Sequence, residues 1–196
     1  MKNLKKIPFR KICLLTGIGL VLSAGIMLLL WQGRILWSQR RAASIVDTLR
    51  ILMPEAHGSV PEVRTDNTMP ILSLDGTDFI GILEMPIHGS ALPVCAEWGQ
   101  LSRYPSYFGG SIYDRTMQIG GMSQKGQYDF YREISVGDEL FFTDMTGNCY
   151  AYTVENIRYT QHADQSELNR EEAALVLFIK NVYAFEYILV FCEVLD

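Results

Sequence analysis

The side chains that could do chemistry are few, and they are scattered along the chain. The 196-residue sequence contains four cysteines and three histidines. Cys95 lies close in sequence to His88, so a thiol–imidazole pair that activates a nucleophile could form there. A free cysteine is more commonly a small buried core residue, and a single loop histidine is more commonly structural. Cys95 and His88 therefore form only a weak candidate pair.

Lys180 ends the apolar run Leu-Val-Leu-Phe-Ile-Lys over residues 175–180. A short apolar run rich in branched residues predicts a buried strand, and residues 187–194 predict a second one. Only the six residues 181–186 lie between them, which favours an antiparallel pair. Lysine becomes a nucleophile only where burial suppresses its charge. The simpler interpretation is that Lys180 pairs with a nearby acid such as Glu186.

No metal site or cofactor is expected, because the sequence contains neither C-x-x-C nor H-x-x-x-H spacing. Cys13 falls in or beside a long apolar run. The other three cysteines, Cys95, Cys149 and Cys192, allow at most one disulfide among themselves. Cys149 and Cys192 both fall in predicted strands, so we expect them to be small buried core residues.

Charge divides the chain into two parts. Residues 1–41 contain eight Lys/Arg and no acid, whereas residues 42–196 contain all 22 acids and a balance of −13. An acidic domain is a poor partner for nucleic acid. Residues 12–31 are twenty residues without a charge, long enough to span a bilayer of about 30 Å.

The basic tail over residues 1–11 predicts a cytoplasmic N-terminus. A cleaved signal peptide is the alternative, but its apolar region would be shorter and would end in a small-x-small site. We therefore expect an uncleaved signal-anchor over residues 12–31, in a single-pass cell-membrane protein whose C-terminal domain is extracellular.

The rest of the sequence predicts one mainly β domain. Residues 32–78 are interpreted as a juxtamembrane helix, to residue 52, followed by a linker, and the folded domain is placed at residues 79–196. Gly147-Asn148 predicts a hairpin turn. The segments expected to be strands are 79–86, 92–95, 117–119, 139–143, 149–157, 175–180 and 187–194, with short helices at 128–134 and 166–173. Many short strands with few helices indicate a closed or nearly closed β-barrel with helical insertions.

Several segments, taken in order, resemble the sortases, the cysteine transpeptidases that attach proteins to Gram-positive cell walls. The resemblance covers the chain from about residue 79 to its end. The segments that carry it are Phe-Ile-Gly-Ile-Leu-Glu-Met-Pro (79–86), Leu-Pro-Val (92–94), Ile-Gly-Gly-Met (119–122), Val-Gly-Asp-Glu-Leu (136–140), Tyr-Ala-Tyr-Thr-Val (150–154) and residues 175–180. It implies a sortase-like barrel in which a cysteine attacks a peptide carbonyl, a histidine protonates the leaving amine and an arginine stabilises the developing charge.

The sequence departs from the family pattern at all three of these positions. Met122 stands where the family has histidine, Lys180 where it has cysteine, and Tyr187 where it has arginine, with Glu186 as the neighbouring possibility for the last. No catalytic residue is therefore expected. The resemblance implies a substrate groove lined by Met122, Phe178, Lys180 and Tyr187.

Three functions are consistent with this pattern. The first is a membrane-anchored sortase-like domain without transpeptidase activity, which binds an extended sorting-signal peptide or a surface protein, or assists an active sortase. The second is an active sortase or hydrolase that uses a displaced residue set, with Cys95 and His88. The third is a structural envelope protein that makes its contacts through the helix over residues 32–52.

Overall fold

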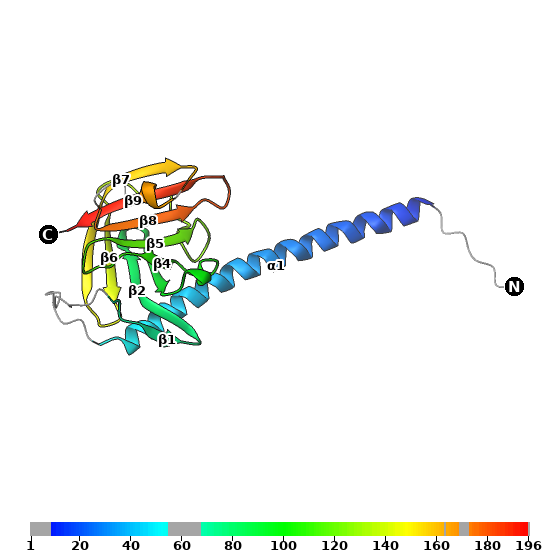
Figure 1. The fold of residues 1–196 in the computed structure, drawn as a ribbon. Coiled ribbons are helices and arrows are strands. Elements are labelled where there is room, and N and C mark those ends of the chain that lie inside the picture. The colour runs from blue at the N-terminus through cyan, green and yellow to red at the C-terminus, as the bar shows by residue number, and fades with distance from the viewer. Residues whose placement is uncertain (1–8, 55–67, 163, 169–172, 196) are drawn as a thin grey trace. The chain divides into compact units, whose positions relative to one another are not determined.

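The computed structural model describes residues 9–54, 68–162, 164–168 and 173–195 (Figure 1). The chain divides into two compact units, residues 1–37 and residues 38–196. The second unit contains all of the strands and the candidate site. Residues 55–67, half of the linker predicted over residues 53–78, lie outside the described residues, as do residues 169–172 of the helix predicted over 166–173.

The longest helix, α1 (Phe9–Leu52), includes the helix predicted over residues 32–52. In the part of the chain that the structure describes, we find no helix that is long and apolar enough to cross a membrane. The transmembrane helix predicted over residues 12–31 is therefore not supported. At the other end of α1, Ala42, Val46 and Leu49 are buried in one cluster with Phe79 and Cys95 of the sheet.

Nine strands form one sheet in the order β1-β2-β3-β4-β5-β8-β9-β7-β6, and a pairing between β2 and β6 closes β2 to β9 into an eight-stranded barrel (Figure 1). The predicted closed β-barrel is thus confirmed. The strands are β1 (Leu72–Leu74), β2 (Thr77–Met85), β3 (Ser90–Cys95), β4 (Ser106–Gly109), β5 (Met117–Met122), β6 (Glu139–Asp144), β7 (Cys149–Thr160), β8 (Leu175–Lys180) and β9 (Tyr187–Val194).

The two closing strands lie where the sequence predicts them. β9 pairs antiparallel with the whole length of β8, and β8 also pairs parallel with β5. Both strands are covered on two faces because alternate residues enter different clusters. Leu175, Leu177 and Ile179 belong to the main core inside the barrel, whereas Val176 and Phe178 belong to a smaller cluster on the outer face.

The hairpin of β6 and β7 is confirmed. Gly147 adopts a φ of +86°, which glycine tolerates and which the turn requires. The segment 128–134 is wrong as a helix: it forms successive turns, although Phe130 and Ile134 are buried as expected. The other described helices are the short α2 (Gln165–Leu168) and the 3-10 turns η1 (Pro86–His88) and η2 (Trp98–Gln100).

Two strands were not predicted from the sequence, and one cysteine was misplaced. β1 begins at residue 72, so the sheet starts before residue 79, and β4 lies within a segment that carried no strand prediction. Cys149 is exposed at the start of β7 rather than buried, whereas Cys192 is buried as expected. Cys95, Cys149 and Cys192 are all free thiols.

Candidate functional site

The strand register places Met122, Lys180 and Tyr187 side by side. Met122 ends β5 and is the pairing partner of Lys180, which ends β8. Lys180 is in turn the partner of Tyr187, which begins β9. Three residues that are distant in sequence thus form one row across adjacent strand ends, which we call the strand-end row. Lys180 is exposed, and the other two side chains are half-buried.

The row lies on the outer face of the barrel. Side chains alternate along a strand, so Lys180 shares a face with Phe178 and not with the interior Ile179. On β5, Met122 shares that face with Gly120, the pairing partner of Phe178. The next row inward on the same face therefore contains Gly120 and Phe178.

Phe178, a residue predicted to line the groove, is instead largely covered by other rings. Trp98 of η2 stacks on Phe178 with ring centroids 5.3 Å apart, and Phe108 of β4 meets Phe178 edge-on at 5.1 Å. Trp98 and Phe108 meet each other at 5.0 Å. We call these three residues the ring platform. Gly120 permits it, because a Cβ at that position would overlap the rings of Trp98 and Phe178.

The loop after the strand-end row is held by buried polar groups. Asn181 and Ser123 are both buried. The Ser123 backbone N–H donates to the Lys180 carbonyl at 3.0 Å, and the Ser123 Oγ accepts from the Val182 N–H at 3.0 Å. The Asn181 amide nitrogen donates to Glu186 Oε1 at 2.8 Å. These hydrogen bonds hold the Lys180 carbonyl and the loop that follows it.

The predicted pairing of Lys180 with Glu186 is not observed. Glu186 is engaged by Asn181, and the ion pairs found among the described residues do not include Lys180. The ammonium of Lys180 is thus exposed at the end of β8 without a carboxylate within 4.0 Å in the described part of the chain.

Cys95 lies in a site that a substrate does not reach. Its side chain is fully buried among apolar residues that include Phe79 and Tyr104. Burial, together with the nearby charge of Glu97, raises the pKa of the Cys95 thiol to about 12. Because the thiolate is the reactive form of cysteine, Cys95 is poorly suited to act as a nucleophile at neutral pH.

His88 lies at the opposite end of β3 from Cys95, because η1 precedes the strand and Cys95 ends it. A six-residue strand spans roughly 16 to 20 Å, so the two side chains do not form a pair. The His88 Nε2 lies 3.2 Å from Asp138 Oδ2, and its ring stacks on Phe130 at 4.9 Å. The Nδ1 faces Glu133 Oε2 at 3.9 Å. Each ring nitrogen therefore faces a carboxylate rather than a nucleophile.

His88 also lines a cavity of about 440 Å³ that is separate from the strand-end row. Its other polar walls include Ser90, Lys125, Asp129 and Glu133. Lys125 is paired with Asp129 at 2.8 Å. No group of metal-binding side chains is found among the residues described here.

Sequence reasoning did not identify Trp98, Phe108 or Arg158 as neighbours of the site. Arg158 of β7 is the pairing partner of Leu189, and its guanidinium lies 5.5 Å from the centre of the Phe191 ring on the outer face. No local signal marks these residues, because Trp98 is in a loop and Arg158 is in an alternating strand. The one clue was Gly120, since glycine inside a strand indicates a close approach by another group.

The comparisons with known proteins concern the fold. No protein-family model matches the sequence, and no curated protein matches it. Among solved structures, sortase C1 from Streptococcus agalactiae aligns with a TM-score of 0.51 over 63% of this chain and 71% of its own, at 17% identity. The fold is that of the sortases. A Clostridium perfringens sortase C, solved with the C-terminal cell wall sorting motif, aligns with a TM-score of 0.50 over 61% of this chain and 71% of its own, at 18% identity.

On this sortase-like barrel, the strand-end row supplies a thioether, an ammonium and a phenol. A thioether does not exchange protons, and a charged ammonium does not attack a carbonyl. An ammonium and a phenol can, however, donate hydrogen bonds to a carboxylate or a carbonyl oxygen. The arrangement can therefore bind an acceptor group, and it has no combination of nucleophile and base.

Proposed function

We propose that this protein is a sortase-like domain that binds an extended peptide without cleaving it, as an accessory protein in cell-surface protein assembly. The observation that carries the proposal is the strand-end row, where Met122, Lys180 and Tyr187 lie in register at adjacent strand ends. The sequence resemblance to sortases assigns these three positions to histidine, cysteine and arginine. A scaffold that keeps the register while replacing the reactive groups is suited to binding rather than to turnover.

An active enzyme that uses Cys95 and His88 has less support. The thiol is buried, the imidazole faces carboxylates, and the two lie at opposite ends of β3. A nucleophile and its base must reach hydrogen-bond distance for general-base activation. Neither residue can meet this requirement without rearrangement of the β2–β3 region.

The proposal is tested with the full-length chain, a pool of sorting-signal-like peptides and an amine acceptor. We expect peptide binding by fluorescence anisotropy, and we expect mass spectrometry to detect no cleavage, no transfer and no covalent adduct. A thioester on any cysteine, or release of a peptide fragment, would overturn the proposal, and the modified residue would identify the true site. Failure of every peptide to bind would also overturn it.

A matched variant tests whether the scaffold itself remains suitable for catalysis. Met122→His, Lys180→Cys and Tyr187→Arg are introduced together and assayed with the same peptides. An acyl-enzyme adduct on the new cysteine is the expected gain, because the thiolate would stand at an exposed strand end. Lys180→Cys alone is the control, since it lacks the base and the guanidinium.

The proposed signal-anchor over residues 12–31 rests on the length of this segment, its lack of charge and the basic tail before it. We propose a single-pass attachment to the cell membrane with the barrel outside. The test is fractionation of cells that express the full-length chain, followed by alkaline extraction. Release of the protein into the alkaline supernatant would contradict this attachment. It would leave the peptide-binding proposal standing.

A further inference from the structure

The exposed ammonium of Lys180 adjoins an apolar surface that is also exposed. Along β8, Phe178 and Lys180 point to the same face two residues apart, a separation of about 7 Å. Trp98 and Phe108, which pack on Phe178, are each 40% exposed, so the ring platform presents apolar surface to solvent. A cation thus stands at one edge of an aromatic surface.

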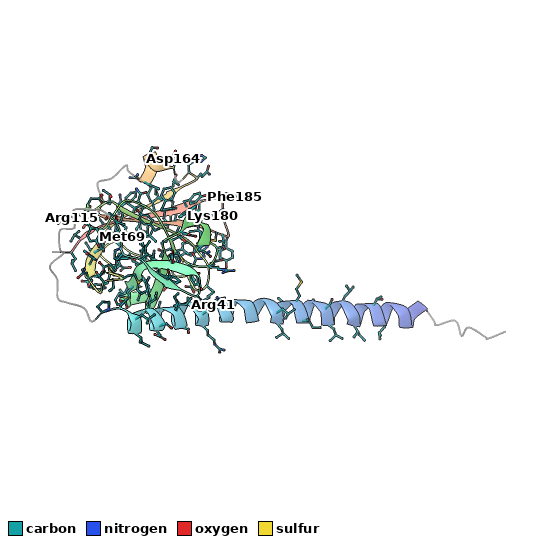
Figure 2. All side chains as sticks on the ribbon, turned by 60° about the horizontal axis from the view of Figure 1, so that its bottom comes forward. Arg41, Met69, Arg115, Asp164, Lys180 and Phe185 are labelled. Atoms are coloured by element: carbon teal, nitrogen blue, oxygen red, sulfur yellow. The ribbon has the colours of Figure 1, made fainter. Side chains whose placement is uncertain are left out.

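The loop after Lys180 adds to this apolar surface. Val182, Tyr183 and Phe185 are all exposed, and Phe185 is fully so. Figure 2 shows Phe185 and Lys180 at the same side of the barrel. Because hydrogen bonds from Ser123 and Asn181 hold the backbone of this loop, the apolar side chains are presented on a fixed support rather than on a loose tip.

The sign of the charge at this place is opposite to that of the domain. Residues 42–196 carry a balance of −13, so the domain as a whole repels anions. The Lys180 ammonium has no acidic neighbour within ion-pair distance among the described residues, and the neighbouring Tyr187 adds a phenol donor. A ligand group that prefers this point is therefore a hydrogen-bond acceptor, and a carboxylate fits best.

We propose that the ring platform and the strand-end row together bind a peptide in which an apolar or aromatic side chain lies one or two residues from a carboxylate. The apolar side chain packs against Trp98 and Phe108, and the carboxylate accepts hydrogen bonds from Lys180 and Tyr187. This inference rests on the proposed peptide-binding function and names the class of peptide. The carboxylate comes either from an Asp or Glu side chain or from the peptide's own C-terminus.

The test measures the affinity of the full-length chain for four fluorescent peptides by anisotropy. All share one aromatic residue, and they differ two residues later in having internal Glu, internal Gln, a terminal carboxylate or a terminal amide. We expect the carboxylate peptides to bind about three- to tenfold more tightly than their neutral partners, as for a partly exposed charge-assisted contact. If only the internal Glu and Gln peptides differ in affinity, the site binds a side-chain carboxylate. If only the terminal carboxylate and amide peptides differ, it binds a C-terminal carboxylate.

Lys180→Gln should abolish this preference by weakening the two carboxylate peptides to the level of their neutral partners, whereas Trp98→Ala should weaken all four peptides. Arg115→Gln is the matched control, because it removes one exposed positive charge just before β5, at the opposite end of that strand from Met122.

If the peptides bind with no carboxylate preference, or if Arg115→Gln reduces the preference as strongly as Lys180→Gln, this inference is overturned and the peptide-binding function stands. If none of the four binds while the wider pool does, only this inference fails. If nothing in either set binds, both fail.

Discussion

Two regions of the barrel divide between them the properties that a nucleophilic site must combine. The strand-end row is exposed and held in register, but it contains no thiol or imidazole. The region around β3 contains both groups, but Cys95 is buried at one end of the strand and His88 is held between carboxylates at the other. Nucleophilic catalysis needs reactive groups and access at the same place, and these two regions each supply only one of them.

The difference shows how little residue content alone says about a site. A cysteine and a histidine seven positions apart look like a pair in the sequence, but a strand between them holds them far apart. Met122, Lys180 and Tyr187 look unrelated in the sequence, but strand pairing makes them neighbours. Strand register therefore decides which residues form a site.

The largest expected effect is on thiol reactivity. In the folded protein, Cys149 should react readily with a thiol reagent, while Cys95 should react at least about 1,000-fold more slowly. A pKa of about 12 in place of 9.0 leaves about one thousandth as much thiolate at pH 7 to 8. Mass spectrometry of the labelled protein over time measures both rates. Equal rates for the two cysteines would place Cys95 within reach of a substrate and remove the contrast between the regions.

The second prediction compares the two faces of β5. A Cβ on Gly121 would overlap the fully buried ring of Tyr128, so Gly121→Ala should lower the free energy of unfolding by about 1 to 3 kcal/mol. Gly120→Ala would overlap the rings of Trp98 and Phe178, and it should cost less because Trp98 is partly exposed and can move outward. Chemical denaturation followed by circular dichroism gives both values. The reverse order would mean that the ring platform is as tightly packed as the interior.

The third prediction concerns the support of His88. Asp138 Oδ2 accepts from the Ser135 N–H at 2.9 Å and lies 3.2 Å from His88 Nε2. Asp138→Ala removes a partner from both groups and should lower the free energy of unfolding by about 1 to 2 kcal/mol. Glu133→Ala is the control, because Glu133 is mostly exposed and its carboxylate is 3.9 Å from the ring. A cost for Glu133→Ala equal to that for Asp138→Ala would show that the contact with Asp138 is not what holds His88.

The smallest expected effect is on stability at the strand-end row. Lys180 is exposed and contributes no ion pair among the described residues, so Lys180→Gln should change the free energy of unfolding by less than about 0.5 kcal/mol. The melting temperature, measured beside that of Arg115→Gln, checks this. A large loss would mean that Lys180 is retained for structure, and it would weaken the case for a binding role.

The sequence predicted the parts of the fold that depend on local pattern. The apolar runs of β8 and β9 and the glycine turn of the β6–β7 hairpin all lie where expected. β4 was missed because its four residues include an exposed ring that packs only against distant residues. The sequence predicts a helix over residues 128–134 because Phe130 and Ile134 are spaced four apart, but the segment forms turns.

The strand register places Met122, Lys180 and Tyr187 side by side, but the sequence did not predict which residues surround them. Nothing local connects Trp98 with Phe178, and the cover over that ring depends on a loop that reaches the sheet at Gly120. Peptide binding depends on the surface that Met122, Lys180 and Tyr187 form together. Binding by these residues stays a prediction.

The packing of α1 against β2 and β3 has a practical consequence for handling the protein. Ala42, Val46 and Leu49 pack in one buried cluster with Phe79, Ile82 and Cys95. A fragment that begins at residue 79 would therefore expose an apolar surface and the Cys95 thiol. Such surfaces promote self-association, and the released thiol would cross-link between molecules in air. A fragment that begins near Ser38 keeps this cover and should remain monodisperse.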